Sequence, residues 1–352
     1  MPNKDIKYYA SMTWQLTEDD FSEAFYKEFS EMSWSAKDSS LSEDIEDWKS
    51  IDPEFRNAAL IGLITNKVYK QFVASYCLPV IIDGVDYTYL TRKSMLATIM
   101  DRMMSTHSLS ITDMLSTFGS AEKINNNYNE LIAEESFTSL LNEIRVNTNL
   151  LSSYNLQKTL QEDISKKDST FNENNYNIVL WKELVYLTAV LDTCYLVPFY
   201  VFLTHASTGR FPNTREAIQL LYRDVGIITT YLSTLANELY QFFDEHTKLE
   251  LTEWVHRKME KIIKDYQFLL VENGAKPTLV KGVMKYFEYS LNKTLFKLGF
   301  EEKFETVVMP SRIKQAIMQE FNETRYRFLY RNPKIRLTTL GLIKKRIGRF
   351  FK

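Results

Sequence analysis

The chain has 352 residues, and 45% of them are hydrophobic, which is enough for a sizeable core. Its formal net charge is only −2, and we expect no nucleic-acid partner. The charge is unevenly distributed, because residues 325–352 carry ten Lys or Arg and no acid, which leaves a balance of −12 for residues 1–324.

Long helices are predicted along most of the chain. Only 10 Gly and 8 Pro are present and alternating β-branched runs are scarce, so we expect an all-α fold. Cys77 and Cys194 lie far apart, which favours a reducing compartment over a disulfide framework or a Cys-based zinc site. Residues 1–4 lead into polar sequence without the apolar segment of a secretory signal, so the expected location is cytoplasmic.

Six short stretches carry distinctive patterns. In chain order they are Phe25-Tyr26 with Trp34, Ser42-Glu43-Asp44 with Trp48, Ala59–Leu63, Met103–Phe118, Gly209–Asp224 and Tyr289–Glu301. Aromatic and Leu patterns recur in many helical proteins, so no single stretch identifies a family. Only the six stretches together, in this order along the chain, can indicate a family.

The segment Leu184–Leu203 is twenty residues long with one charge, Asp192, and has the length of a membrane span. Asp192 and Pro198 are both unfavourable in lipid, whereas a helix at the centre of a large bundle is apolar on all sides. We therefore expect a buried core helix.

Glu253 and His256 form a Glu-x-x-His pattern, with both side chains on one helix face. The pattern lies outside the six stretches and has no second copy, and two ligands alone rarely hold a dimetal site. We expect no metal there.

The C-terminal segment has apolar residues at helical spacing: Leu340, Ile343, Ile347 and Phe350. Basic side chains fall largely on other faces: Lys344, Lys345, Arg346 and Arg349. This pattern is typical of a basic amphipathic helix for an anionic membrane or an acidic partner, and a solvated basic tail is the alternative. The sequence thus divides into residues 1–324 and a tail of residues 325–352.

The six stretches together resemble the class I ribonucleotide reductase small (beta) subunits, closest to the bacterial class Ib manganese/iron type, from about Phe25 to Glu302. The resemblance implies a ferritin-like helical bundle, an antiparallel homodimer, a reductase large subunit as partner, and deoxyribonucleotide biosynthesis for DNA replication. Active members generate a radical with a dimanganese or diiron cofactor.

The resemblance also implies ligand positions, and most of them are substituted. Such a bundle binds two metals with a carboxylate from each of two helices and Glu-x-x-His from each of the other two. The first Glu-x-x-His position reads Met104 to His107, so only the histidine is kept, and the second falls on Val225 and Ile228. Neither aliphatic side chain coordinates a metal.

The two remaining carboxylate positions are less firmly placed. The first falls on Lys67 if the Gly62-Leu63 match is extended without a gap, and the second falls on Leu191 or, with one deletion, Asp192. The radical tyrosine position, four residues after His107, is Ile111. We therefore expect no cofactor, and dimanganese or diiron only if these positions are wrongly aligned.

Three residues of the family's electron-transfer route are nevertheless present: Trp34, His107 and Asp224. In active relatives they carry an electron and a proton toward the large subunit. A route without an oxidant has no driving force, so a satisfied polar network that fixes helix register is the preferred interpretation.

Three hypotheses follow. The first is a degenerate structural or regulatory partner of the large subunit or of an active small-subunit paralogue. The second is an active reductase subunit with an unusual radical cofactor among its 21 Tyr and 5 Trp. The third is an interaction protein that docks through its basic tail.

Overall fold

The computed structural model describes residues 19–36, 40–85, 89–162 and 171–317. Every element assigned within these ranges is helical. The boundary at residues 324/325 and the basic tail with Lys344, Lys345, Arg346 and Arg349 lie outside the described residues, so the two-part division remains a prediction.

Helices of very different length follow one another along the chain, from 6 to 31 residues. The helices are α2 (Asp20–Glu31), α3 (Ile45–Ser50), α4 (Pro53–Phe72), α5 (Leu78–Gly84), α6 (Leu90–Arg102), α7 (Ser108–Phe118), α8 (Ala121–Ala133), α9 (Glu135–Glu162), α10 (Glu173–Val190), α11 (Tyr200–Ala206), α12 (Pro212–Phe242), α13 (Glu245–Glu272) and α14 (Pro277–Lys297). Shorter turns are η3 (Leu41–Asp44) and η7 (Val197–Phe199), which are 3₁₀, and η4 (Val73–Cys77), η5 (Met103–His107) and η6 (Leu191–Tyr195), which are π-helical.

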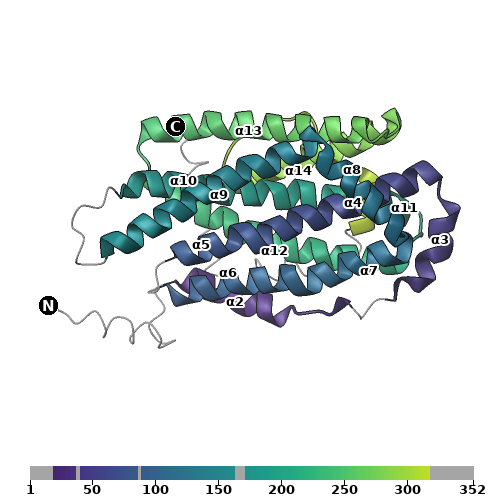
Figure 1. Ribbon diagram of the computed structural model, residues 1–352, viewed down its shortest axis with the longest axis horizontal. Coiled ribbons are helices and arrows are strands. Elements are labelled where there is room, and N and C mark those ends of the chain that lie inside the picture. The colour runs from purple at the N-terminus through teal and green to yellow at the C-terminus, as the bar shows by residue number, and fades with distance from the viewer. Residues whose placement is uncertain (1–18, 37–39, 86–88, 163–170, 318–352) are drawn as a thin grey trace.

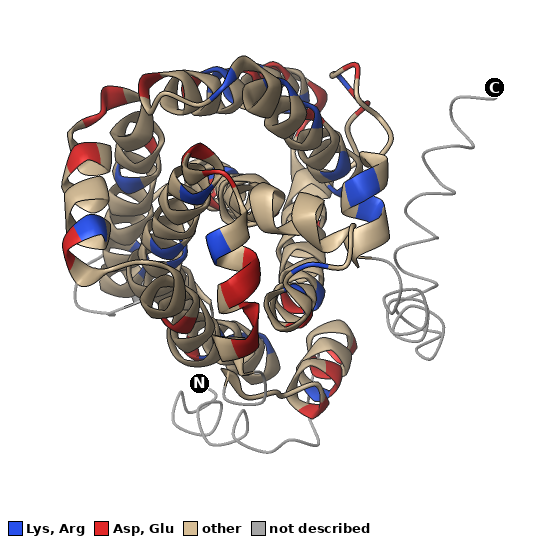
Figure 2. Ribbon diagram, turned by 90° about the vertical axis from the view of Figure 1, so that its right-hand side faces the viewer, with Lys and Arg blue, Asp and Glu red and all other residues tan. Residues whose placement is uncertain are grey.

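The long helices run along one direction and bury a single apolar core (Figure 1). Helix α10 packs against α12 and α9, α4 packs against α7, and α2 lies along α6. Helix α13 covers α9 and α14 at the opposite edge (Figure 1). Viewed along the helices, Lys, Arg, Asp and Glu lie on the outer helices and also on a short helix in the middle of the view (Figure 2).

The apolar segment forms the centre of the bundle, as expected. The stretch Glu173–Ala206 is long and apolar enough to cross a membrane, but 94% of its most apolar window is buried inside the protein. Close packing here requires Gly62, because a Cβ at that position would lie 2.6 Å from the carbonyl oxygen of Pro198. Glycine therefore allows α4 to approach η7 closely.

Two carboxylates in the second sequence stretch bind the N-terminus of the long central helix α12. Backbone N–H and hydroxyl groups of Thr214 both donate to Asp44 Oδ2 at 2.6 Å, and Phe211 N donates to Asp47 Oδ2 at 2.7 Å. Carboxylates at a helix N-terminus satisfy donors that have no partner within the helix and oppose the helix dipole. Asp44 and Asp47 thus fix the start of α12, which carries Asp224.

Three π-helical turns interrupt the helices that surround the candidate site. Turn η4 follows α4, η5 joins α6 to α7, and η6 ends α10. Each π turn rotates the following side chains relative to a regular helix, and such turns often mark functional sites. This rotation decides which residues of η5 and η6 face the core.

Candidate functional site

A buried hydrogen-bonded network joins Trp34, Asp224 and His107. Trp34 Nε1 donates to Asp224 Oδ2 at 2.8 Å, and His107 Nε2 lies 3.2 Å from the same oxygen. His107 and Asp224 are fully buried, whereas Trp34 is partly exposed. The structure therefore brings together the three residues selected from the sequence.

Two arginines hold this network against the end of α2. Arg223 Nη2 lies 3.1 Å from Asp224 Oδ1, and Arg102 Nη1 lies 3.6 Å from Oδ2. Both guanidinium groups also donate to the carbonyl oxygen of Met32, and Arg102 donates to that of Phe29 at 2.8 Å. The contacts fix the chain just before Trp34.

The second ring nitrogen of His107 has a partner that the sequence did not reveal. The Tyr195 hydroxyl lies 3.2 Å from His107 Nδ1, and the two rings are stacked at a centroid distance of 6.0 Å. Tyr195 lies in η6 and is fully buried. Both nitrogens of His107 are therefore engaged by side chains of this chain.

Electrostatics determine the charge states of the network. Burial opposes ionisation of Asp224, but the hydrogen bond with His107 and the charge of Arg223 outweigh it and lower the Asp224 pKa. Burial lowers the pKa of His107, although Asp224 partly counters this effect. At neutral pH the network thus consists of a carboxylate and a neutral imidazole.

A second buried carboxylate, Asp192, is neutralised by lysines. Lys297 Nζ lies 2.9 and 2.7 Å from its two oxygens, and Lys293 Nζ lies 3.4 Å from Oδ1. The hydroxyls of Thr229 and Thr294 donate to the two oxygens at 3.2 Å. Burial opposes ionisation of Asp192, but the two ammonium charges outweigh it and lower its pKa.

Asp192 and His107 face different partners. Asp192 is directed at α12 and α14, whereas His107 contacts Tyr195 and Asp224. No hydrogen bond or ion pair joins the two within the described residues. Leu191, the alternative family position, is also fully buried.

On α4, the structure differs from the gapless alignment. Lys67 is only partly buried and donates from Nζ to Thr112 Oγ1 at 3.0 Å, whereas Asn66 and Lys70 are fully buried. Asn66 Nδ2 donates to the Tyr195 carbonyl oxygen, and Lys70 Nζ has no hydrogen-bond partner among the described residues. Burial and the charge of Lys67 lower the pKa of Lys70 to about 8. Lys70, rather than Lys67, is the lysine inside the bundle.

The π turn η5 produces a second difference. Met104, at the predicted carboxylate position, is 46% exposed, and Met103 is fully buried in its place. In a π turn the residue four positions before His107 shares its face more closely than the residue three positions before it. Ile111, Val225 and Ile228 are fully buried and form ordinary apolar core.

The Glu253 and His256 pair does not converge on one point. Glu253 is exposed and pairs with Arg257 at 3.7 Å, whereas His256 packs against the ring of Phe300. In the part of the chain that the structure describes, no group of three or more His, Cys, Asp or Glu could hold a metal ion.

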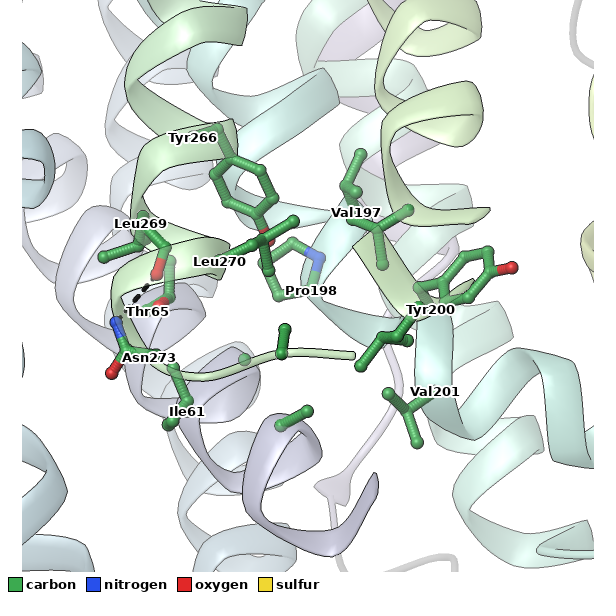
Figure 3. Close-up of a pocket in the computed structure, with 15 residues that line it drawn as sticks. Ile61, Thr65, Val197, Pro198, Tyr200, Val201, Tyr266, Leu269, Leu270 and Asn273 are labelled. Atoms are coloured by element: carbon green, nitrogen blue, oxygen red, sulfur yellow. Dashed lines mark hydrogen bonds between the residues drawn. The ribbon is translucent and has the colours of Figure 1, made fainter. Parts of the chain in front are cut away.

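A separate apolar pocket of about 40 Å³ lies between α4, α11 and α13 (Figure 3). Tyr266, Leu269 and Pro198 are among its lining residues, and the Asn273 amide donates to the Leu269 carbonyl oxygen at one edge. Small-molecule sites usually enclose about 300–1,000 Å³. This pocket is too small for a nucleotide and contains no residue of the His107 network.

Comparison with known proteins identifies the family. Residues 11–310 match the family described as ribonucleotide reductase, small chain. The chain belongs to this family. It is 23% identical over 299 residues to the ribonucleoside-diphosphate reductase subunit beta of Bacillus subtilis strain 168, an alignment that covers 85% of this chain and 84% of that protein.

Solved structures support the same fold. The dimanganese(II) NrdF of Streptococcus sanguinis has a TM-score of 0.67 at 16% identity, covering 87% of this chain and 98% of that one. The ribonucleotide reductase R2 subunit of Clostridium botulinum has a TM-score of 0.61 at 18% identity, covering 85% and 88%. The predicted all-α ferritin-like bundle and small-subunit family are confirmed.

The side chains of this small-chain homologue do not fit a dimetal centre. Manganese and iron at such centres need several carboxylate oxygens to offset two divalent charges. Asp192 is already paired with two lysines, His107 Nδ1 is bonded to Tyr195, and the charge of Lys70 acts on His107. The other predicted ligand positions carry Lys67, Met104, Val225 and Ile228, and none of these side chains is a carboxylate.

Sequence reasoning missed Tyr195, Lys70, Lys293 and Lys297. One signal was available for Lys70, because Leu63, Asn66 and Lys70 recur at helical spacing on the α4 face that is buried. No spacing rule connects Asp192 to lysines about one hundred residues later. Tyr195 lies three residues after Asp192, but only the π turn directs it toward His107.

Proposed function

We propose that this chain is a ribonucleoside-diphosphate reductase small-subunit homologue that builds no dimetal radical cofactor. It serves as a structural or regulatory subunit in deoxyribonucleotide synthesis, bound to the large subunit or to an active small-subunit paralogue. We also propose a cytoplasmic homodimer. The buried free thiols Cys77 and Cys194 are compatible with a reducing compartment.

One observation carries the proposal. The two side chains that survive at ligand positions, His107 and Asp192, are both bonded to other side chains of the same protein. A metal at Asp192 would displace Lys293 and Lys297 and leave two ammonium groups close to it. Two lysine ammonium groups thus already balance the carboxylate that a metal at this position would need.

Metal content tests the first part. The protein is purified from cells supplied with manganese and iron, and both metals are measured by mass spectrometry. The Bacillus subtilis subunit beta, prepared in parallel, controls for metal supply. We expect well below one metal per chain, and a value near two would overturn the proposal and require a reductase assay.

Reconstitution tests the second part. The chain is added to the large subunit of its own host, with and without an intact small subunit from the same genome, and deoxyribonucleotide formation is measured. We expect no turnover from this chain and the large subunit alone, and a concentration-dependent change when the intact subunit is present. Turnover without the intact subunit would favour an active subunit with an unusual cofactor. No effect in either assay would remove the regulatory role.

The composition of residues 325–352 supports a second candidate, docking through the basic tail to an anionic membrane. Vesicle flotation of the full chain against a chain truncated after Glu323 tests it. Flotation of the full chain only would support this role, and equal behaviour would remove it.

A further inference from the structure

Tyr195 differs from most buried tyrosines in its hydrogen-bond partner. Its hydroxyl contacts the imidazole of His107 at 3.2 Å, and its ring stacks on that imidazole with an interplanar angle of 17°. Tyr231, which is equally buried, contacts the Ser22 hydroxyl at 2.8 Å instead. Imidazole accepts a proton readily, whereas a serine hydroxyl does not.

The network determines the direction of the Tyr195 hydrogen bond. Asp224 accepts from Trp34 and lies beside two guanidinium groups, so it is an accepting carboxylate and His107 Nε2 carries the proton that it shares with Asp224. With that proton on Nε2, Nδ1 is the nitrogen that accepts from the Tyr195 hydroxyl. The phenol therefore points its proton at a base that is itself held by a carboxylate.

The same network reaches the protein surface. The rings of His107 and Trp34 have centroids 6.3 Å apart, and Trp34 Nε1 donates to Asp224 at 2.8 Å. Trp34 is partly exposed, whereas Tyr195, His107 and Asp224 are fully buried. The His107 imidazole thus lies between the buried phenol of Tyr195 and the indole of Trp34, which an external molecule can approach.

We propose that Tyr195 is a redox-active tyrosine that is oxidised through Trp34 by an external one-electron oxidant. The Tyr195 O–H bond breaks, the proton forms an N–H bond at His107 Nδ1, and the electron leaves through the His107 and Trp34 rings to the oxidant. The products are a neutral tyrosyl radical, an imidazolium and the reduced oxidant. Re-reduction returns the electron to Tyr195 and the proton from His107.

The surroundings both favour and oppose this step. Burial raises the pKa of Tyr195 well above its usual value, so the phenol cannot lose its proton to solvent first and needs an acceptor in place. The carboxylate of Asp224 stabilises the imidazolium that forms, whereas the charges of Lys70, Arg102 and Arg223 oppose it.

This inference goes beyond the proposed function. An external oxidant removes the electron from Tyr195, and the chain itself does not generate the oxidant. The oxidant belongs to the chemical class of one-electron oxidants able to oxidise an aromatic side chain, such as a tryptophan or tyrosine radical of a partner protein. Metal content and radical location are independent measurements, so either proposal can fail without the other.

Isotope labelling of the full-length protein tests whether the radical is located on Tyr195. Ring-deuterated tyrosine is incorporated at position 195, or at position 231 as the matched control, and the protein is oxidised by a photogenerated ruthenium(III) tris-bipyridyl complex. Samples are frozen within milliseconds and examined by electron paramagnetic resonance. We expect the label at 195 to narrow the hyperfine pattern and the label at 231 to leave it unchanged. An unchanged spectrum with the label at 195 would overturn the proposal, and the label leaves the fold intact.

Two variants test the route, using the same label at position 195. His107→Gln keeps a hydrogen-bonding side chain but removes the base, and we expect loss of most of the Tyr195 signal. Trp34→Phe should slow formation of that signal, whereas Trp254→Phe, at an indole outside the network, should not. A Tyr195 signal of unchanged yield in His107→Gln would overturn proton transfer to His107. Unchanged kinetics in Trp34→Phe would overturn the path through the indole.

Discussion

Asp192 and Asp224 are both buried carboxylates, but they are neutralised in different ways. Asp192 is paired with Lys293 and Lys297, whose side chains are 20% and 10% exposed, and two threonine hydroxyls complete its shell. Asp224 is bonded to an indole and an imidazole and has two arginines beside it. Lysine ammonium groups balance the charge of Asp192, whereas the partners of Asp224 include an indole N–H and an imidazole.

Because of this difference, we expect the stability of the protein to depend more on one of the two carboxylate charges than on the other. Removing one partner of a buried ion pair leaves the other charge uncompensated, which is more costly than losing a neutral hydrogen bond. Lys297 also donates to the Thr229 hydroxyl, whereas Arg102 and Arg223 also donate to backbone carbonyl oxygens. Asp192 should therefore be the more sensitive position.

The largest effect is expected from Asp192→Asn. The change removes the carboxylate that two ammonium groups share and should lower the free energy of unfolding by about 3 kcal/mol. This is the low end for buried pairs, because both lysines reach some solvent. Urea denaturation at pH 7 measures this, with Glu253→Gln at an exposed ion pair as the control, expected within about 0.5 kcal/mol of wild type. A loss equal to that of the control would mean that the lysine cluster is not a structural replacement for metal.

The pH dependence of this variant has a definite sign. The folded pKa of Asp192 lies below its ordinary value of 3.8, so the carboxylate stabilises the fold above that pH. The stability difference between wild type and Asp192→Asn should be constant near neutrality. It should decrease as the pH falls below about 4 and through the folded pKa.

Asp224→Asn should have a smaller effect, about 2 kcal/mol. The amide oxygen can still accept from Trp34, and the arginines keep their contacts with Met32. The same denaturation measurement compares the two sites, with the exposed Glu46→Gln as control. A larger loss than that of Asp192→Asn would reverse the proposed order of the two carboxylates.

Lys70→Met should stabilise the protein by about 1–2 kcal/mol, because a buried amine without a partner is replaced by an apolar side chain of similar length. Lys49→Met, at an exposed ion pair, is the control and should change stability little.

The stabilisation by Lys70→Met should depend on pH. The folded pKa of Lys70 is about 8, below its ordinary value of 10.5, so both states bind the proton below about pH 8 and the burial cost is fully present there. As the pH rises from about 8 to about 10.5, the folded state has lost the proton and the unfolded state has not. The advantage of the variant should therefore shrink across this interval, and an advantage that grew with pH would contradict the shift.

Much of the fold could be predicted from the sequence, because helical periodicity and the order of six stretches constrain a bundle strongly. Trp34, His107 and Asp224 could be selected for the same reason, although their role in electron transfer stays a prediction. The charge compensation could not be predicted, since Asp192 meets Lys293 and Lys297 only through the packing of η6 against α14.

Two register differences have local causes. The π turn η5 directs Met103 rather than Met104 into the bundle, and a sequence pattern based on regular helices does not reveal a π turn. On α4, counting from Gly62 without a gap selected Lys67, whereas the buried face contains Asn66 and Lys70. In both cases the sequence showed which residue types are present, but it could not show which side chain points into the bundle.

Trp34→Phe should have the smallest effect, about 1 kcal/mol, because it removes one hydrogen bond to Asp224 while keeping an aromatic ring at a partly exposed position. A double-mutant cycle with Asp224→Asn measures the coupling between the two side chains. If the Trp34 indole stabilises the protein mainly through the charge of Asp224, its contribution should fall markedly in the Asp224→Asn background. If the contribution is unchanged there, Trp34 acts by packing alone, and the indole at the surface end of the network owes its position to neighbouring side chains rather than to the carboxylate it contacts.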